Sequence, residues 1–105
     1  TPLGDVAETK AIYSLVGGNE ENLSVGSTKS MHGHLLGAAA GIEAIVCAKA
    51  VQEDVVPGTI NIENKDPDVP IQNIPGEARE GKVEYALSNS FGFGGHNSSL
   101  VLGKV

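Results

Sequence analysis

The residues most able to do chemistry in this sequence are two neighbouring histidines, His32 and His34, which precede a long apolar run. The run predicts a helix over about 33–52, with His34 at its N-terminus. The partial positive charge of a helix N-terminus disfavours imidazolium, and a neutral imidazole can donate one N–H to a developing oxyanion. His34 is therefore a candidate oxyanion donor. A capping or a buried, hydrogen-bonded histidine is the alternative.

Metal and thiol chemistry are not favoured by the spacing of the remaining ligand types. His32 and His34 have no second ligand cluster at a suitable distance along the chain, so we expect no metal site. The single cysteine, Cys47, excludes an internal disulfide. On a continuous helix Cys47 would lie roughly 20 Å beyond His34, at about 1.5 Å per residue. We expect a buried structural thiol.

Glu43 is a carboxylate inside the apolar run. On a regular helix it would lie about two and a half turns beyond His34 and point away from it. An unpaired buried carboxylate is costly, so Glu43 requires a partner. Lys29, in the segment before the helix, is the predicted partner, with a solvated loop lysine as the alternative.

A glycine-rich stretch near the C-terminus, residues 89–97, carries both phenylalanines. A phosphate loop does not fit, because the last glycine of that motif would fall on Asn97 and a strand follows. We expect a loop whose backbone N–H groups line a site while the Phe93 ring moves. A hairpin connection with two half-buried rings is the alternative.

The elements that position these residues indicate an α/β fold. Thr1 and Pro2 predict the start of a helix that ends at Gly17–Gly18. Residues 53–82 hold four prolines and much of the acid, which favours an extended surface connection. The expected strands cover residues 23–27, about 58–62, 83–89 and 98–102.

Composition limits the class of protein. The chain has 105 residues, a net charge of −6, 40 % hydrophobic and 4 % aromatic residues. The few basic residues are scattered, so we expect no nucleic-acid partner. The predicted central helix is apolar nearly all round, but Glu43 at mid-span would cost about 3 kcal/mol in a membrane. We therefore expect a helix covered by protein on more than one side. Because the sequence begins with Thr-Pro rather than Met, we also expect a chain that continues upstream of Thr1.

Taken together, four segments resemble the C-terminal end of an elongating β-ketoacyl-acyl-carrier-protein synthase, of the thiolase-like superfamily. In order along the chain they are residues 1–5 (TPLGD), 26–39 (GSTKSMHGHLLGAA), 43–44 (EA) and 89–95 (NSFGFGG). The resemblance implies the C-terminal portion of a layered α-β-α-β-α fold, with residues 1–105 as the C-terminal part of the synthase's C-terminal domain.

The resemblance also implies roles for individual residues. His34 matches the second catalytic histidine, which stabilises the malonyl enolate; Lys29 matches the lysine beside the site, and Glu43 its buried acidic partner. Phe93 matches the loop phenylalanine of the oxyanion hole and acyl gate, together with Phe91 and Gly92. Thr1 matches a threonine that contacts the phosphopantetheine arm.

The implied reaction is a decarboxylating condensation of an acyl chain with malonyl-acyl-carrier protein. The implied partners are acyl carrier protein, malonyl and acyl thioesters and a second copy in a homodimer, without a separate cofactor, nucleic acid or membrane. The implied compartment is the bacterial cytoplasm or an organelle. The nucleophilic cysteine and the first catalytic histidine have no counterpart here, so we expect this chain to be inactive alone. A malonyl decarboxylase or chain-length-factor-like homologue, a polyketide ketosynthase domain and a non-catalytic binding module are the alternatives.

Overall fold

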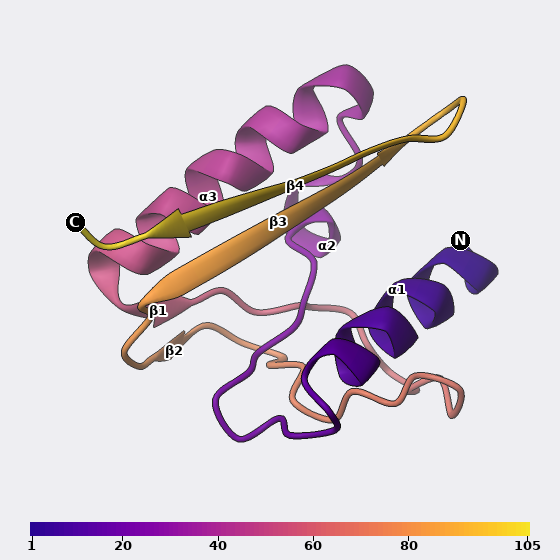
Figure 1. The fold of residues 1–105 in the computed structure, drawn as a ribbon, viewed down its shortest axis with the longest axis horizontal. Helices are drawn as coiled ribbons and strands as arrows, with labels where there is room; N and C mark the ends of the chain where they lie inside the picture. The colour runs from indigo at the N-terminus through magenta and orange to yellow at the C-terminus, as the bar shows by residue number, and fades with distance from the viewer.

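Helices and strands are both present in the computed structural model, which describes all of residues 1–105, so the expected α/β class is confirmed (Figure 1). No helix combines the length and the apolar character that a membrane span requires. The elements in chain order are α1 (Pro2–Leu15), α2 (Lys29–His32), the 3-10 turn η1 (Leu36–Ala38), α3 (Ala39–Glu53), β1 (Val55–Val56), β2 (Arg79–Glu80), β3 (Tyr85–Gly92) and β4 (His96–Gly103).

The first helix, α1, begins and ends where the sequence predicts. The Thr1 hydroxyl oxygen accepts a hydrogen bond from the Gly4 N–H at 3.0 Å, and Pro2 opens the first turn. This proline needs no N–H there, because the first amides of a helix have no intrahelical acceptor. Gly17 and Gly18 then adopt φ values of 61° and 77°, which end the helix.

The single helix predicted over 33–52 is wrong at its N-terminal end. The chain instead makes the one-turn helix α2, a loop, η1 and then α3, which starts only at Ala39. Gly33 and Leu36 adopt φ values of 75° and 51°, both in the left-handed region, and this backbone cannot continue a right-handed helix. His34 therefore lies in a loop, not at the N-terminus of the long helix.

The two C-terminal strands form an antiparallel hairpin that is longer than predicted. Its register runs from Tyr85 opposite Gly103 to Gly92 opposite His96. Only residues 93–95 form the turn, with Gly94 and Gly95 at φ values of 83° and 79°. The expected loop over 90–97 is thus mostly strand, and the hairpin alternative describes it better.

The strands predicted at 23–27 and 58–62 do not form. Each segment instead makes a single backbone–backbone hydrogen bond to the connection before β2, from Val25 N to Asn73 O at 3.1 Å and from Thr59 N to Pro75 O at 2.7 Å. The second small sheet pairs β1 with β2, two residues each. Pro57 directly follows β1, and because proline has no N–H to donate, a longer ladder is not possible there.

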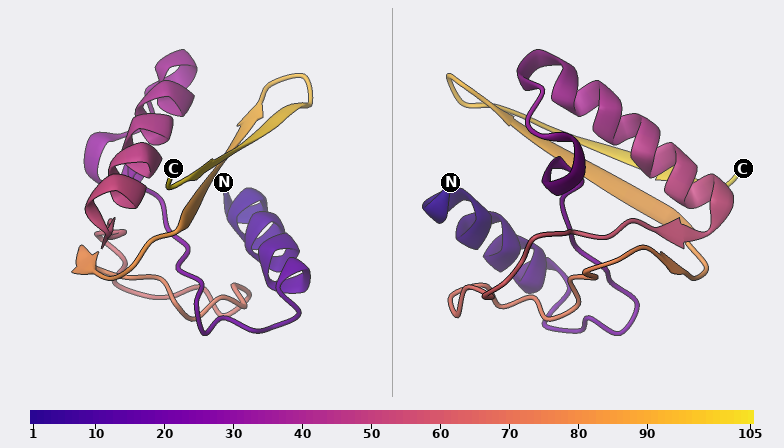
Figure 2. Two further views of the ribbon diagram at one scale, coloured as in Figure 1. Left: turned by 60° about the vertical axis from the view of Figure 1, so that its left-hand side comes forward. Right: turned by 180° about the vertical axis from the view of Figure 1, so that it is seen from behind.

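The hairpin lies between two helices, as the left-hand view of Figure 2 shows, with α3 on one side and α1 on the other. Side chains alternate across β3. Asn89 extends from it to α1, where its Nδ2 donates to Glu8 Oε1 at 3.0 Å. The chain thus forms a helix–sheet–helix arrangement.

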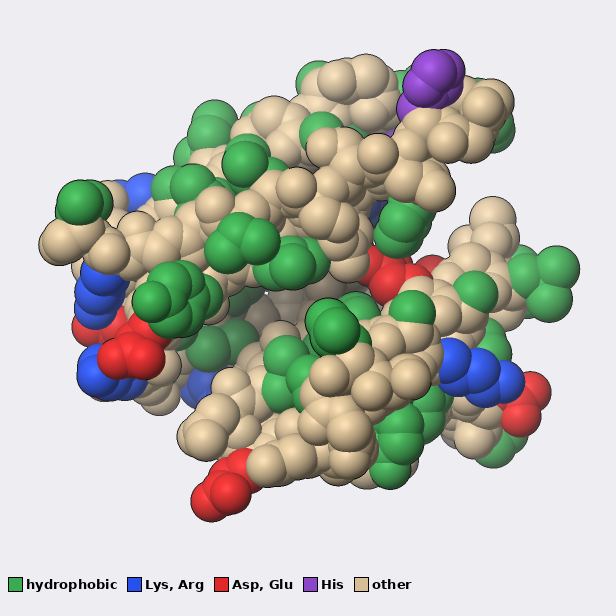
Figure 3. Space-filling model, viewed as in Figure 1, with side chains coloured by type: hydrophobic (Ala, Val, Ile, Leu, Met, Phe, Trp, Pro, Cys, Tyr) green, Lys and Arg blue, Asp and Glu red, His purple; other side chains and the backbone are tan.

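Apolar surface remains open on both sides of this arrangement. The accessible surface is 7420 Å², whereas a folded monomer of 10.8 kDa exposes roughly 5,500 Å². Only 6 of 105 residues are buried, and Ile45 on α3 and Val101 on β4 are 62 % and 61 % exposed. Figure 3 shows hydrophobic side chains around a hollow on one face. The second layer expected over α3 is not supplied by this chain.

As an isolated polypeptide, residues 1–105 should therefore unfold over a broad temperature range without a cooperative transition. The measurement is differential scanning calorimetry with near-ultraviolet circular dichroism. A sharp two-state transition of the monomer, with an enthalpy of about 70 kcal/mol as expected for roughly 100 residues, would show that the open apolar faces do not limit stability.

Asp54 ties the end of α3 to the last segments of the chain. Its carboxylate accepts from the Val83 N–H at 2.9 Å and pairs with Lys104 Nζ at 2.6 Å, while its backbone carbonyl accepts from the Gly81 N–H at 2.9 Å. Its φ of 57° is left-handed, a conformation that Asp and Asn tolerate better than other side chains. The Lys104 hydrogen bond first, and the Val83 N–H second, hold the pKa of Asp54 below its usual value.

The contribution of Asp54 to stability should depend on pH. A carboxylate with a lowered folded pKa stabilises fully above the ordinary aspartate pKa of about 3.9, and the effect is lost as the pH falls through the lowered pKa. Asp54→Asn keeps the left-handed preference but removes the charge. We expect it to lower the Tm of the native protein at pH 7, and the difference from wild type to shrink below about pH 4. Asp54→Ala, the control, should be less stable than Asp54→Asn at both pH values; a pH-independent difference between wild type and Asp54→Asn would refute the assignment.

Candidate active site

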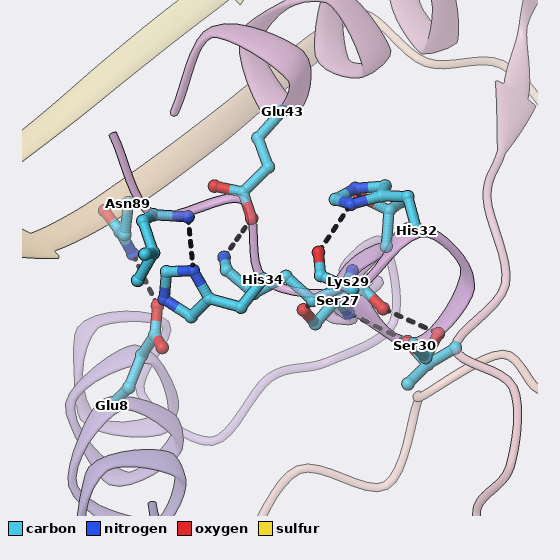
Figure 4. A network of polar contacts seen from close by, with 12 residues as sticks. Glu8, Ser27, Lys29, Ser30, His32, His34, Glu43 and Asn89 are labelled. Carbon is cyan, nitrogen blue, oxygen red and sulfur yellow. Dashed lines mark hydrogen bonds and ion pairs between the residues drawn. The ribbon is translucent and has the colours of Figure 1, made fainter. Parts of the chain in front are cut away.

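An ion pair joins the α2 turn to the long helix. Lys29, the first residue of α2, places its Nζ on the Glu43 Oε1 of α3, as Figure 4 shows. The Glu43 side chain is 13 % exposed and that of Lys29 is 32 % exposed. The predicted pairing is confirmed. Because water is largely excluded from the carboxylate, this pair interacts more strongly than an exposed one.

His34 is held by a local hydrogen bond. Its Nδ1 accepts from the Leu36 backbone N–H at 3.0 Å. A ring nitrogen that accepts carries no proton, so the neutral ring has its proton on Nε2. The free Nε2–H is then available as a donor. The donor role of His34 remains a prediction. Its predicted position at the N-terminus of the long helix is wrong, since α3 begins five residues later.

The prediction that His34 and Glu43 point apart assumes a regular helix between them. It does not apply, because no such helix joins the two residues. Figure 4 draws the His34 ring and the Lys29–Glu43 pair in one group of polar side chains. The loop over residues 33–35 and the η1 turn bring the histidine to this group.

Leu36 is a residue that sequence reasoning missed. It supplies the N–H to His34 while at a φ of 51°. A left-handed, non-glycine residue of this size costs about 1–3 kcal/mol and persists only where the surroundings impose it. No local pattern signals it, since leucine is normally a good helix former.

A second polar connection, also missed, joins α1 to the hairpin. Asn89 Nδ2 donates to Glu8 Oε1, and Asn89 Oδ1 accepts from the Ser99 hydroxyl at 2.6 Å. Asn89 and Ser99 are opposite each other in the ladder. Thr1 caps the helix that contains Glu8. The Asn89–Glu8 hydrogen bond therefore also fixes the position of Thr1 relative to the hairpin.

The remaining predicted site residues lie at the edges of this group. Phe91 and Gly92 are the last two residues of β3, and Phe93, in the turn, is 96 % exposed. No hydrogen bond joins Phe93 to His34 or Lys29. Thr1 caps α1, with an exposed side chain. Their suggested roles remain predictions.

Cys47 is half-buried, one turn beyond Glu43 on α3, and less covered than predicted. Burial, and then the charge of Glu43, raise the pKa of this thiol. A protonated thiol is a poor nucleophile, so the cysteine is not part of the reactive group. No three or more His, Cys, Asp or Glu side chains are arranged to hold a metal ion.

A protein-family model and several known proteins match this chain. Residues 1–63 match the family described as "Beta-ketoacyl synthase, C-terminal domain". The chain is 53 % identical, over 99 % of its length, to the 3-oxoacyl-[acyl-carrier-protein] synthase 2 of Synechocystis sp., and 46 % identical, over its whole length, to the protein of that name from Coxiella burnetii. It spans about a quarter of the length of both relatives.

Solved structures agree. The ishigamide ketosynthase/chain length factor superposes with a TM-score of 0.86 at 38 % identity, over 96 % of this chain and 25 % of that one. A type II polyketide-synthase ketosynthase in complex with its acyl-carrier protein superposes with a TM-score of 0.85 at 34 % identity, over 93 % of this chain and 24 % of that one. The expected partial thiolase-like fold is thereby confirmed.

The Lys29–Glu43 pair should contribute more to stability than an exposed pair. We expect a double-mutant cycle of Lys29→Met and Glu43→Gln in the native protein to give a coupling of about 1–3 kcal/mol. The measurement is chemical denaturation.

The matched control lies on the same helix. Lys49 and Glu53 form an i,i+4 pair whose side chains are 56 % and 53 % exposed, and their cycle should give about 0.3–0.5 kcal/mol. Equal couplings in the two cycles would mean that the Lys29–Glu43 pair is no better shielded than the surface pair.

Proposed function

The chain belongs to the β-ketoacyl synthase family, and on that premise we propose that it supplies the enolate-stabilising part of a carrier-protein-dependent condensing site. The reaction joins an acyl chain to malonyl-acyl-carrier protein with loss of CO₂, giving a β-ketoacyl-acyl-carrier protein in fatty-acid elongation. Residues 1–105 form the C-terminal part of the synthase's C-terminal domain. The nucleophilic cysteine belongs to another part of the protein, since the only cysteine here is Cys47.

The hydrogen bond from Leu36 N–H to His34 Nδ1 is the observation that carries this proposal. When the malonyl thioester loses CO₂, the electron pair of the broken C–C bond moves onto the thioester oxygen as an enolate. The His34 Nε2–H donates to that oxygen, which stabilises charge as it develops. The enolate carbon then attacks the acyl-cysteine thioester, a C–C bond forms, and the cysteine leaves as thiolate.

Lys29 and Glu43 hold the turn on which His34 depends. The ammonium of Lys29 provides positive charge beside the site, and Glu43 compensates it when no substrate is bound. The low exposure of Glu43 supports this role, because a shielded carboxylate keeps its partner in one place.

The phenylalanine turn and Thr1 complete the site in this proposal. Phe93 supplies a backbone N–H to the acyl oxyanion, and its ring gates the acyl pocket with Phe91 and Gly92 beside it. The exposure of the ring supports a mobile gate, since no packing partner holds it. The Thr1 hydroxyl accepts from Gly4 but keeps its own proton to donate to the phosphopantetheine arm.

Acyl carrier protein is the proposed partner, because a similar structure is a ketosynthase in complex with its acyl-carrier protein. Both thioester substrates arrive on its phosphopantetheine, so no separate cofactor is required. We further propose the bacterial cytoplasm as the compartment, because the relatives are bacterial. The homodimer is proposed from the family resemblance.

A chain-length-factor role is the second candidate, favoured by the likeness to the ishigamide ketosynthase/chain length factor. The elongating synthase has stronger support, since the identity to those relatives is 53 % and 46 %, against 38 %. The two roles differ in acyl loading: a protein without the nucleophilic cysteine would not accept a labelled acyl group from its carrier.

In the full-length protein, His34→Ala should slow malonyl decarboxylation by about 10²–10³, the usual loss for one oxyanion donor. Transfer of the acyl group to the cysteine should be nearly unchanged, because that step does not form the enolate. The measurements are release of labelled CO₂ from malonyl-acyl-carrier protein and transfer of a labelled acyl group. His34→Gln, which keeps an amide N–H near the Nε2 position, should recover part of the rate. Decarboxylation by His34→Ala at the wild-type rate would exclude the role of His34.

A further inference from the structure

His32 makes a hydrogen bond at each end of the α2 turn. Its Nε2 lies 3.0 Å from the Thr28 hydroxyl oxygen, and its Nδ1 lies 2.8 Å from the Gly33 carbonyl oxygen. The ring is partly buried. A four-residue helix is not stable by itself, so these side-chain bonds contribute to holding the turn in one conformation.

The two hydrogen-bond partners of His32 are the sequence neighbours of Lys29 and His34. Thr28 directly precedes Lys29, and Gly33 directly precedes His34. The Gly33 carbonyl belongs to the peptide that joins Gly33 to His34, so the bond from His32 sets the orientation of that peptide. Gly33 itself adopts a φ of 75°, where glycine has little preference for one conformation. The peptide therefore needs an external partner.

The proton positions on the ring follow from the partners. A carbonyl oxygen only accepts, so Nδ1 of His32 carries a proton. Nε2 accepts from the Thr28 hydroxyl in the neutral ring and donates to it in the charged ring, because a hydroxyl can do both. Both bonds thus persist in either protonation state. The arrangement is the reverse of that at His34, where Nδ1 is the acceptor.

We propose that His32 is a positioning residue for His34. It holds the Gly33–His34 peptide so that His34 Nδ1 stays on the Leu36 N–H and its Nε2–H keeps one direction. This inference rests on the role proposed for His34. Ser30, on the same turn, offers a contrast: its hydroxyl bonds Ile60 N at 3.0 Å and Ser27 O at 2.9 Å, neither of which adjoins His34.

Three substitutions of His32 separate its two bonds in the full-length protein. His32→Asn keeps an amide near the Nδ1 position, within reach of the Gly33 carbonyl. His32→Gln keeps one near Nε2, within reach of Thr28. His32→Ala keeps neither, and Ser30→Ala is the matched control that loses two bonds from the same turn.

We expect His32→Ala to lower kcat for malonyl decarboxylation by about 10- to 100-fold, the usual effect of losing a residue that orients a reactive group, with KM nearly unchanged. His32→Asn should recover most of the rate and His32→Gln little of it. Ser30→Ala should retain the wild-type kcat. Amide hydrogen exchange over residues 33–38 should accelerate in His32→Ala and not in Ser30→Ala, because Leu36 N–H loses a fixed acceptor.

Equal rates for His32→Asn and His32→Gln, or exchange over 33–38 that is the same in every variant, would overturn the proposal. The Asn–Gln comparison and the exchange measurement also decide the matter if His32→Ala does not fold. A fast His34→Ala variant would refute the function proposed for His34. A slow His34→Ala variant beside a fast His32→Ala variant would refute only the positioning role.

Discussion

The Lys29–Glu43 ion pair is the contact on which the rest of the site depends, because Glu43 is a largely buried carboxylate in the apolar first part of α3. A carboxylate that is 13 % exposed must be compensated by a nearby cation. Lys29 can reach it only if the segment before α3 folds back along the helix. That requirement links the α2 turn, and with it the loop that carries His34, to the N-terminal part of α3.

Because the segment folds back, His34 lies in a loop and not in the helix. In the loop its ring can accept a hydrogen bond from a backbone N–H. Within a regular helix the Leu36 N–H would bond a main-chain carbonyl four residues earlier. Here it is free to bond the imidazole, at the cost of a left-handed leucine. The strain and the fixed tautomer come from one backbone conformation, as is common where a site must be preorganised.

The layers around this turn explain both its rigidity and the open surface elsewhere. The β3–β4 hairpin packs on α3 with one face and holds α1 through Asn89 and Glu8 with the other. The outer faces of α3 and β4 keep apolar side chains exposed. The chain spans about a quarter of the length of its relatives, and apolar faces of this extent require other polypeptide to cover them.

Local chemistry alone determined α1, whose cap and proline lie next to each other in sequence, and the hairpin strands, which glycines separate. It also favoured the Lys29–Glu43 pair, since a buried Glu43 requires a cation and Lys29 lies in the segment just before the apolar run. Tertiary structure decided the break before Ala39, the β1–β2 pairing and the Glu8–Asn89 bond. It also decided which nitrogen of His34 carries the proton. These features depend on left-handed backbone and on contacts between residues far apart in sequence, and neither leaves a periodic pattern that local propensity can reveal.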